Sequence, residues 1–167
     1  MRRTRIAILG STGSIGTQAL AILREHADRF EAVALQAHGS ASALGVQARD
    51  FRVASICLTG ADEPPADLPV GTKFYPGPDG LIAMLDATAP DVVLNGITGA
   101  AGLAASEWTL RAGRRLALAN KESLVLAGAY LMAIAARTGA EILPVDSEHC
   151  AIHQCLRAGR RSEVRRI

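Results

Sequence analysis

Two carboxylates, Asp146 and Glu148, stand near the end of the sequence with Ser147 between them. In an extended chain, residues two apart point to the same side, so both carboxylates could bind one hard divalent cation. Mg²⁺ and Mn²⁺ prefer such oxygen ligands and complete an octahedral shell with water or substrate oxygens. Alternatively, Asp146 or Ser147 caps a following helix and Glu148 lies in its first turn. Two carboxylates make an incomplete metal site, so a further ligand would have to come from elsewhere.

A second polar group, Asn120-Lys121-Glu122, precedes a long Ala- and Leu-rich segment. Asn120 is a good helix N-cap, and Glu122 suits the positive end of the helix dipole. Lys121 opposes that dipole, so we expect it to have an anionic partner. Helix capping alone is the competing explanation of the segment.

Glycines at positions 10, 13 and 16 form a third group, between an apolar run and a segment with helical spacing. Strand, glycine turn and helix together favour a nucleotide site, because glycine lets the backbone approach a pyrophosphate and helix amides then face the anion. The dinucleotide fingerprint G-x-G-x-x-G would have glycine at position 11, where Ser11 stands. A glycine turn of purely structural use is the alternative.

The segment His38-Gly39-Ser40 follows the second predicted strand, where NAD-specific sites usually carry an Asp or Glu for the ribose 2′-hydroxyl. No carboxylate stands there, which favours NADP. His38, with the amides and hydroxyl of Gly39 and Ser40, could hold the 2′-phosphate. An ordinary exposed loop histidine is the equally good alternative.

Two further patterns are weaker. A second glycine-rich turn, 95–102, allows close backbone approach to a ring or a phosphate, or is simply a tight turn. His149 and His153 are four residues apart with two cysteines nearby, but their order does not fit H-E-x-x-H, so we expect packing or surface roles rather than zinc.

Strands and helices alternate along the whole chain, which predicts an α/β fold: a Rossmann-like, doubly wound, mainly parallel sheet with helices on both faces. In such sheets ligands lie outside the carboxyl ends of the strands, and all five polar groups follow a predicted strand. The predicted strands are 5–9, 31–37, 53–58, 73–75, 91–95, 115–119 and 141–145, and the predicted helices are 17–26, 41–51, 79–88, 99–113, 121–138 and 147–156. A proline-containing surface loop is expected over 59–69.

Composition narrows the class of protein. The 167 residues are 49% hydrophobic but only 4% aromatic, and the net charge of +2 gives no general case for nucleic acid or membrane partners. An arginine-rich stretch at 157–166 is most simply a solvated helix end. Three cysteines without a C-x-x-C pair indicate free thiols, and no signal-peptide segment is visible, so a cytoplasmic protein is expected.

Taken together, four segments resemble the 1-deoxy-D-xylulose 5-phosphate reductoisomerase family of the non-mevalonate route to isoprenoids. They are Gly10-Ser-Thr-Gly-Ser-Ile-Gly16, Gly99-Ala-Ala-Gly-Leu103, Leu118-Ala-Asn-Lys-Glu-Ser-Leu-Val125 and Leu143-Pro-Val-Asp-Ser-Glu-His149. The third and fourth segments are far more specific than the glycine loop, and the resemblance extends over essentially the whole chain.

The resemblance implies roles for individual residues. Lys121 and Ser147 would contact a sugar phosphate substrate, and Asp146 and Glu148 would bind Mg²⁺ or Mn²⁺, Glu148 also facing substrate. The residues that would contact NADPH are Thr12, Gly13, Ser14, Ile15, Gly39, Ser40, Asn120 and Glu122. Ser40 departs from the family pattern, which often has Asn there.

The family's reaction is a metal-assisted rearrangement of 1-deoxy-D-xylulose 5-phosphate to an aldehyde, followed by hydride reduction to 2-C-methyl-D-erythritol 4-phosphate. Family members run to roughly 400 residues and are homodimers. By the same resemblance, residues 1–146 of this chain would form the NADPH-binding domain, and residues 147–167 would begin a catalytic or connective domain. The chain alone is then expected to bind NADPH weakly and to turn over no substrate.

Two other readings remain. A free-standing, non-catalytic NADPH-binding module would show the same glycine loop. A semialdehyde dehydrogenase would need a catalytic cysteine at a strand-to-helix turn, whereas Cys57 lies in a predicted strand and Cys150 in a predicted helix.

Overall fold

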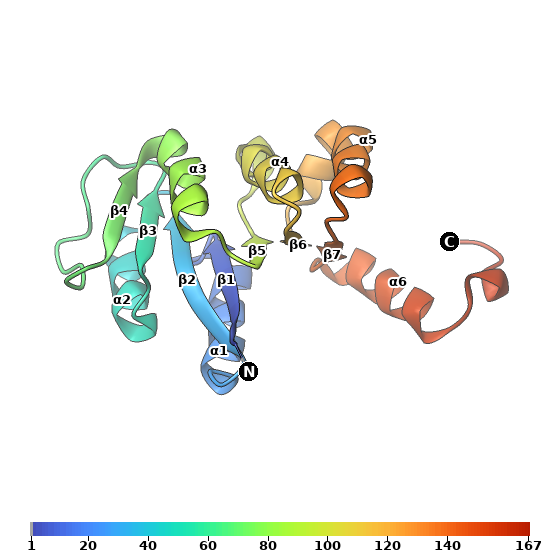
Figure 1. Ribbon diagram of the computed structural model, residues 1–167, viewed down its shortest axis with the longest axis horizontal. Helices are drawn as coiled ribbons and strands as arrows, with labels where there is room; N and C mark the ends of the chain where they lie inside the picture. Colours follow the sequence, from blue (N-terminus) through green and yellow to red (C-terminus); the bar gives the residue numbers. More distant parts are fainter. Residues whose placement is uncertain (1) are drawn as a thin grey trace.

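A computed structural model describes residues 2–167 and shows a seven-stranded sheet in the order β4-β3-β2-β1-β5-β6-β7 (Figure 1). Every neighbouring pair of strands is parallel. The strands are β1 Thr4–Leu9, β2 Phe30–Ala37, β3 Ser55–Leu58, β4 Lys73–Pro76, β5 Val92–Asn95, β6 Arg115–Leu118 and β7 Ile142–Pro144. The prediction of a doubly wound parallel sheet is confirmed.

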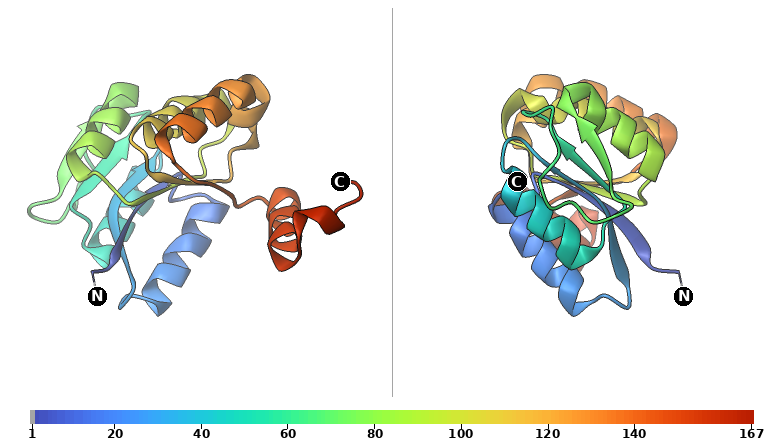
Figure 2. Two further views of the ribbon diagram at one scale, coloured as in Figure 1. Left: turned by 45° about the vertical axis from the view of Figure 1, so that its right-hand side comes forward. Right: turned by 90° about the vertical axis from the view of Figure 1, so that its left-hand side faces the viewer.

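Helices cover both faces of this sheet (Figure 2). Helices α1 (Ser14–Glu25) and α2 (Ala41–Phe51) pack on one face. The opposite face carries α3 (Gly77–Thr88), α4 (Leu103–Arg111) and α5 (Lys121–Thr138). Because the sheet is sandwiched, the central strands carry nearly continuous apolar runs, and Ile8, Leu9 and Leu35 are completely buried.

Most element boundaries agree with the sequence prediction within three residues. The predicted helix 99–113 instead divides into a 3₁₀ turn, η1 (Gly99–Gly102), followed by α4. Helix α1 begins at Ser14 rather than at residue 17, so Gly16 lies inside its first turn. The segment between β3 and β4 is a loop, as predicted, and crosses between parallel neighbours without a helix.

The last helix, α6 (Ser147–Ala158), projects away from the body of the molecule (Figure 2), and a short 3₁₀ turn, η2 (Arg161–Glu163), follows it. None of its residues is buried. Its contacts with the body of the molecule are made chiefly to β7. Within residues 2–167, no helix is both long enough and apolar enough to cross a membrane.

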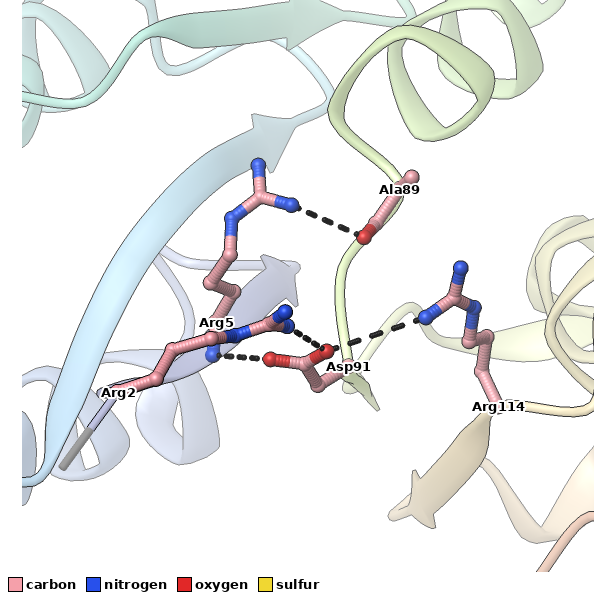
Figure 3. Close-up of polar contacts among 5 residues, drawn as sticks. All are labelled: Arg2, Arg5, Ala89, Asp91 and Arg114. Atoms are coloured by element: carbon pink, nitrogen blue, oxygen red, sulfur yellow. Dashed lines mark hydrogen bonds and ion pairs between the residues drawn. The ribbon is translucent and has the colours of Figure 1, made fainter.

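The amino-terminal ends of the strands are tied together by Asp91 (Figure 3). Its carboxylate accepts a hydrogen bond from the Arg5 amide at 2.9 Å and pairs with the guanidinium groups of Arg2 and Arg114. Arg5 also donates to the carbonyl of Ala89 at 3.2 Å. These contacts join β1, β5 and β6 at the edge of the sheet opposite the predicted site.

Candidate functional site

All five polar groups predicted from the sequence lie at the carboxyl edge of the sheet, since all seven strands are parallel and each group follows a strand. The strand order reverses between β1 and β5, where chain crossovers pass to opposite faces. Such a switch point leaves a crevice, which is where open α/β sheets bind ligands. The glycine turn after β1 and the turn after β5 meet there.

The glycine turn is built on close backbone contacts that no other residue allows. Gly10 has φ +73°, and a Cβ on it would lie 2.7 Å from the carbonyl oxygen of Gly96. A Cβ on Gly16 would lie 2.4 Å from the Gly10 oxygen and the Ser11 Cα. Gly10 and Gly16 are therefore needed for the backbone packing of this turn, which brings the start of α1 directly against the end of β1.

Helix α1 begins without a side-chain cap. Its N-cap is Gly13, and no acidic residue stands in its first turn. The first N–H groups of a helix have no intrahelical partner, so the amides of Ser14, Ile15 and Gly16 are left for another acceptor. An anion such as a pyrophosphate can accept hydrogen bonds from these amides, and the positive end of the helix dipole favours its charge.

Ser11, at the position where the fingerprint has glycine, is completely buried. Its hydroxyl donates to Gln47 Oε1 at 2.7 Å, and its carbonyl accepts from Gln47 Nε2 at 2.9 Å. Its amide donates to the carbonyl of Gln36, whose side chain in turn accepts from the Gly10 amide at 2.8 Å. Two glutamines from β2 and α2 thus hold the turn, which sequence reasoning missed. The signal was Gln36, a polar residue that directly follows the apolar run 32–35 in β2.

The end of β2 places His38, Gly39 and Ser40 at the surface, with no carboxylate among them. Ser40 occupies the N-cap position of α2, but its hydroxyl makes no capping hydrogen bond. The Ala41 amide donates to the Gly39 carbonyl at 2.9 Å, so the amides of Ser42 and Ala43 and the Ser40 hydroxyl are the groups available to a ligand, as in the 2′-phosphate hypothesis.

Asn120 caps α5, as predicted, with Oδ1 accepting from the Ser123 amide at 2.9 Å and from the Ser123 hydroxyl. Its Nδ2 donates to the carbonyls of Ile97 and Gly99. Every hydrogen-bonding position of this buried side chain is used within the protein, and the Asn120 backbone amide donates to the Asn95 carbonyl at 3.2 Å, so neither the side chain nor the amide is left for a ligand. Asn95 holds the same glycine-rich turn, donating to the Gly102 carbonyl and the Ser106 hydroxyl at 2.8 Å each.

Lys121 and Asp146 lie together, although 25 positions separate them in the sequence. With His149 they line a hollow of about 230 Å³ whose other walls are apolar: Leu118, Leu124, Met132, Ile142 and Pro144. Among the described residues, Lys121 makes no ion pair within 4.0 Å. The anionic partner predicted for Lys121 is therefore not a carboxylate of the described residues within ion-pair distance. Glu122 lies half-buried behind it in the first turn of α5.

Asp146 is the N-cap of α6, the alternative that the sequence left open. Oδ1 accepts from the His149 amide at 3.0 Å and contacts His149 Nδ1 at 2.6 Å. Burial raises the pKa of the Asp146 carboxyl, but the hydrogen bonds from His149 lower it further, so the pKa lies below its ordinary value. Asp146 is thus held in its ionised form and lines the hollow.

Glu148 lies exposed in the first turn of α6, and the Ser147 hydroxyl donates to its Oε2 at 3.0 Å. Hydrogen bonds from its own backbone amide and from Ser147 lower the pKa of Glu148, and the positive charge of Lys121 adds to this. The charge of Asp146 acts in the opposite direction, so the two carboxylates repel each other. A divalent cation between them would relieve that repulsion.

A complete metal cage is not formed by the described residues: no group of three His, Cys, Asp or Glu side chains comes together within 2–167. His149 and His153, considered for zinc, have no such cluster around them. Cys57 is buried in β3, and burial raises the pKa of its thiol to about 12, which suits a packing role.

Comparison with known proteins agrees with this arrangement. Residues 6–128 match the family model for 1-deoxy-D-xylulose 5-phosphate reductoisomerase. The enzyme of that name from Anaeromyxobacter sp. (strain K) is 50% identical over 168 residues, which cover 98% of this chain and 43% of the relative. The chain thus spans well under half the length of the curated relatives that it matches.

Solved structures give the same result. The 1-deoxy-D-xylulose 5-phosphate reductoisomerase from Zymomonas mobilis in complex with NADPH is 32% identical, with a TM-score of 0.83 over 92% of this chain and 41% of that one. A DOX-P reductoisomerase in complex with NADPH, fosmidomycin and magnesium is 41% identical, with a TM-score of 0.82 over 92% of this chain and 39% of that one. This chain therefore belongs to the 1-deoxy-D-xylulose 5-phosphate reductoisomerase family.

Proposed function

We propose that this chain supplies the NADPH-binding half and two of the metal ligands of a reductoisomerase. The whole enzyme would convert 1-deoxy-D-xylulose 5-phosphate to 2-C-methyl-D-erythritol 4-phosphate. The observation that carries the proposal is the meeting, at one edge of the sheet, of an uncapped glycine turn with Lys121 and Asp146. Residues 1–146 would form the cofactor domain, with a boundary at the start of α6.

The residues at the switch point fit NADPH. Thr12, Gly13, Ser14 and Ile15 surround the uncapped start of α1 and would hold the pyrophosphate. Gly39 and Ser40 would face the adenosine 2′-phosphate. The absence of a carboxylate after β2 favours NADPH over NADH, because a carboxylate there would repel the phosphate.

The residues on α6 fit a divalent cation in part. The pKa values of Asp146 and Glu148 are both lowered, so both side chains offer the carboxylate oxygens that a divalent cation prefers, and further ligands would come from substrate oxygens and from outside the described residues. Bound NADPH supplies the hydride, and a bound Mg²⁺ or Mn²⁺ supplies Lewis-acid polarisation of the substrate oxygens.

The chain's own side chains would orient the substrate between these two groups. Lys121 presents an unpaired ammonium beside the hollow, and the substrate would provide the anion that its position requires. The Ser147 hydroxyl and Glu148 lie in the adjoining first turn of α6 and would contact substrate oxygens. Asn120 would hold the turn 97–99 next to the cofactor and would contact the cofactor with its backbone. Glu122 would also contact the cofactor.

A fluorescence titration with NADPH and NADH, with and without Mg²⁺, tests the cofactor half. We expect binding of NADPH to be weak but at least tenfold tighter than binding of NADH. Equal affinities for NADPH and NADH would contradict the proposal that the residues after β2 bind the 2′-phosphate. The metal half is tested by Mn²⁺ binding followed by electron paramagnetic resonance, which D146N/E148Q should abolish and the exposed pair D62N/E63Q should leave unchanged.

A non-catalytic NADPH-binding module is the second candidate, favoured by the incomplete metal cage. A steady-state assay of this chain with 1-deoxy-D-xylulose 5-phosphate, NADPH and Mg²⁺ should show no turnover. Normal turnover would contradict the proposal that the remaining metal ligands come from outside the described residues. Absence of turnover together with absence of Mn²⁺ binding would favour the module.

A further inference from the structure

Three polar side chains form a hydrogen-bonded chain at the ends of β2 and β3. Gln36 is 2% exposed, and its Oε1 accepts from the Gly10 amide at 2.8 Å. Its Nε2 donates to Thr59 Oγ1 at 3.1 Å. Thr59 Oγ1 lies 3.2 Å from Nδ1 of His38. The chain therefore connects the glycine turn with the residue that follows β2.

The backbone amide of Gly10 sets the direction of the two hydrogen bonds that Gln36 makes. A backbone amide can only donate, so Gln36 must turn its carbonyl oxygen toward Gly10 and its amino group toward Thr59. Thr59 Oγ1 accepts that hydrogen and keeps its own hydroxyl hydrogen, which it can donate to His38 Nδ1. A neutral imidazole whose Nδ1 accepts carries its hydrogen on Nε2.

The ring of His38 lies against the chain after β3, where only glycine leaves room. A Cβ on Gly60 would lie 2.7 Å from Cε1 and 2.9 Å from Nε2 of His38. The His38 side chain as a whole remains exposed, between the ends of β2 and β3. Next to it, α2 begins without a side-chain cap, and the Ser40 hydroxyl is uncommitted.

We propose that His38 determines cofactor specificity by donating a hydrogen bond from Nε2 to the 2′-phosphate of NADPH. Thr59 is a positioning residue that sets the tautomer of His38. The inference rests on the proposed NADPH-binding function, and it assigns a role to His38, which the family resemblance leaves without one. A ribose 2′-hydroxyl carries no charge, so the contact discriminates NADPH from NADH.

The first test is the substitution H38F, which keeps a flat ring but removes both nitrogens. A hydrogen bond to a charged group contributes about 1.5–3 kcal/mol, so we expect the Kd of NADPH to rise about 10- to 100-fold while the Kd of NADH stays within about twofold. The matched control is H26F, the same change at an exposed histidine at the end of α1. It should leave both affinities unchanged.

The second test addresses Thr59. T59V removes the hydroxyl at nearly constant shape, and T59S restores it. We expect T59V to weaken NADPH binding about threefold and T59S to bind as the wild type does. In ¹⁵N spectra recorded at alkaline pH, His38 should be the Nε2–H tautomer in the wild type and a mixture in T59V.

The outcomes separate this inference from the proposed function. If the wild-type chain binds neither dinucleotide, the proposed function is wrong and the inference falls with it. If the wild type prefers NADPH and H38F keeps the same preference, only the role of His38 is refuted. Equal losses of NADPH and NADH affinity in H38F would also refute it, because they would indicate a general structural effect.

Discussion

The contact between Ser11 and Gln47 offers a quantitative test of how the glycine turn is held. Q47M replaces an amide by a thioether of similar length and leaves a fully buried hydroxyl and carbonyl of Ser11 without their partner at 2.7 and 2.9 Å. An unsatisfied buried polar group costs about 1–3 kcal/mol, so we expect Q47M to lower the free energy of unfolding by roughly 2–4 kcal/mol. For a chain of this length that corresponds to a melting temperature lower by roughly 5–10 °C.

The partner substitution S11A should cost less, about 1 kcal/mol, because water can reach the half-buried Gln47 side chain. In the double variant the costs should not add, and the coupling energy should be about 1 kcal/mol. Urea denaturation measures all four proteins, and NADPH titration shows whether affinity falls with the turn's stability. The control is Q154M on the exposed face of α6, expected within about 0.5 kcal/mol of the wild type.

Two results would refute this reasoning. If Q47M is as stable as the control, the contact does not hold the turn. If the effects of S11A and Q47M add without coupling, the two side chains act independently.

Three further predictions follow from the described contacts. G16A should weaken NADPH binding at least tenfold while the fold is kept, because a Cβ would lie 2.4 Å from the Gly10 oxygen. Titration with NADPH measures the affinity, and circular dichroism checks the fold. Unchanged affinity would show that the turn can shift freely. Cys57 should react with a thiol reagent only after unfolding, because burial raises its pKa to about 12, whereas the exposed Cys155 should react in the native protein; absorbance on labelling counts the thiols, and native labelling of Cys57 would contradict its burial. Burial raises the pKa of Asp91, but its hydrogen bonds and ion pairs to arginines lower it below the ordinary value, so its stabilisation is present above the unfolded pKa of about 3.9 and is lost as pH falls through the folded pKa. D91N should therefore be less stable than the wild type at neutral pH and closer to it in acid, and denaturation curves at both pH values measure the difference.

The order and type of the elements followed from the sequence because they depend on local patterns. Apolar runs such as 6–9 and 92–94 are typical of strands in a parallel sheet that is covered on both faces. The parallel direction of the strands then places every strand end at one edge, so the location of the candidate site followed as well. Asn120 was predicted to be a helix cap from its residue type alone, whereas for the last helix the sequence offered Asp146 or Ser147 only as an alternative to metal binding, and the structure shows that Asp146 is the cap.

Other features depend on contacts between distant residues and could not be predicted. Ser11 looked like a defect in the glycine fingerprint, and only the fold shows that it is bonded to Gln47, 36 positions later. Ser40 has the residue type of a cap and stands at the N-cap position, but its hydroxyl is not turned toward the helix amides. The helix predicted over 99–113 begins as a 3₁₀ turn because side chains of Asn95 and Asn120 bind its first carbonyls.

The isolated position of α6 has a mechanical consequence for the proposed metal ligands. The helix has 12 residues, so it is about 18 Å long, and Asp146 stands at the end that joins the body. If α6 rotated by about 10° around that end, Ala158 would move about 3 Å, whereas Glu148 would move only about 0.5 Å at a rise of about 1.5 Å per residue. The two carboxylates therefore lie at the pivot of the helix. Swinging of the far end would leave their spacing almost unchanged.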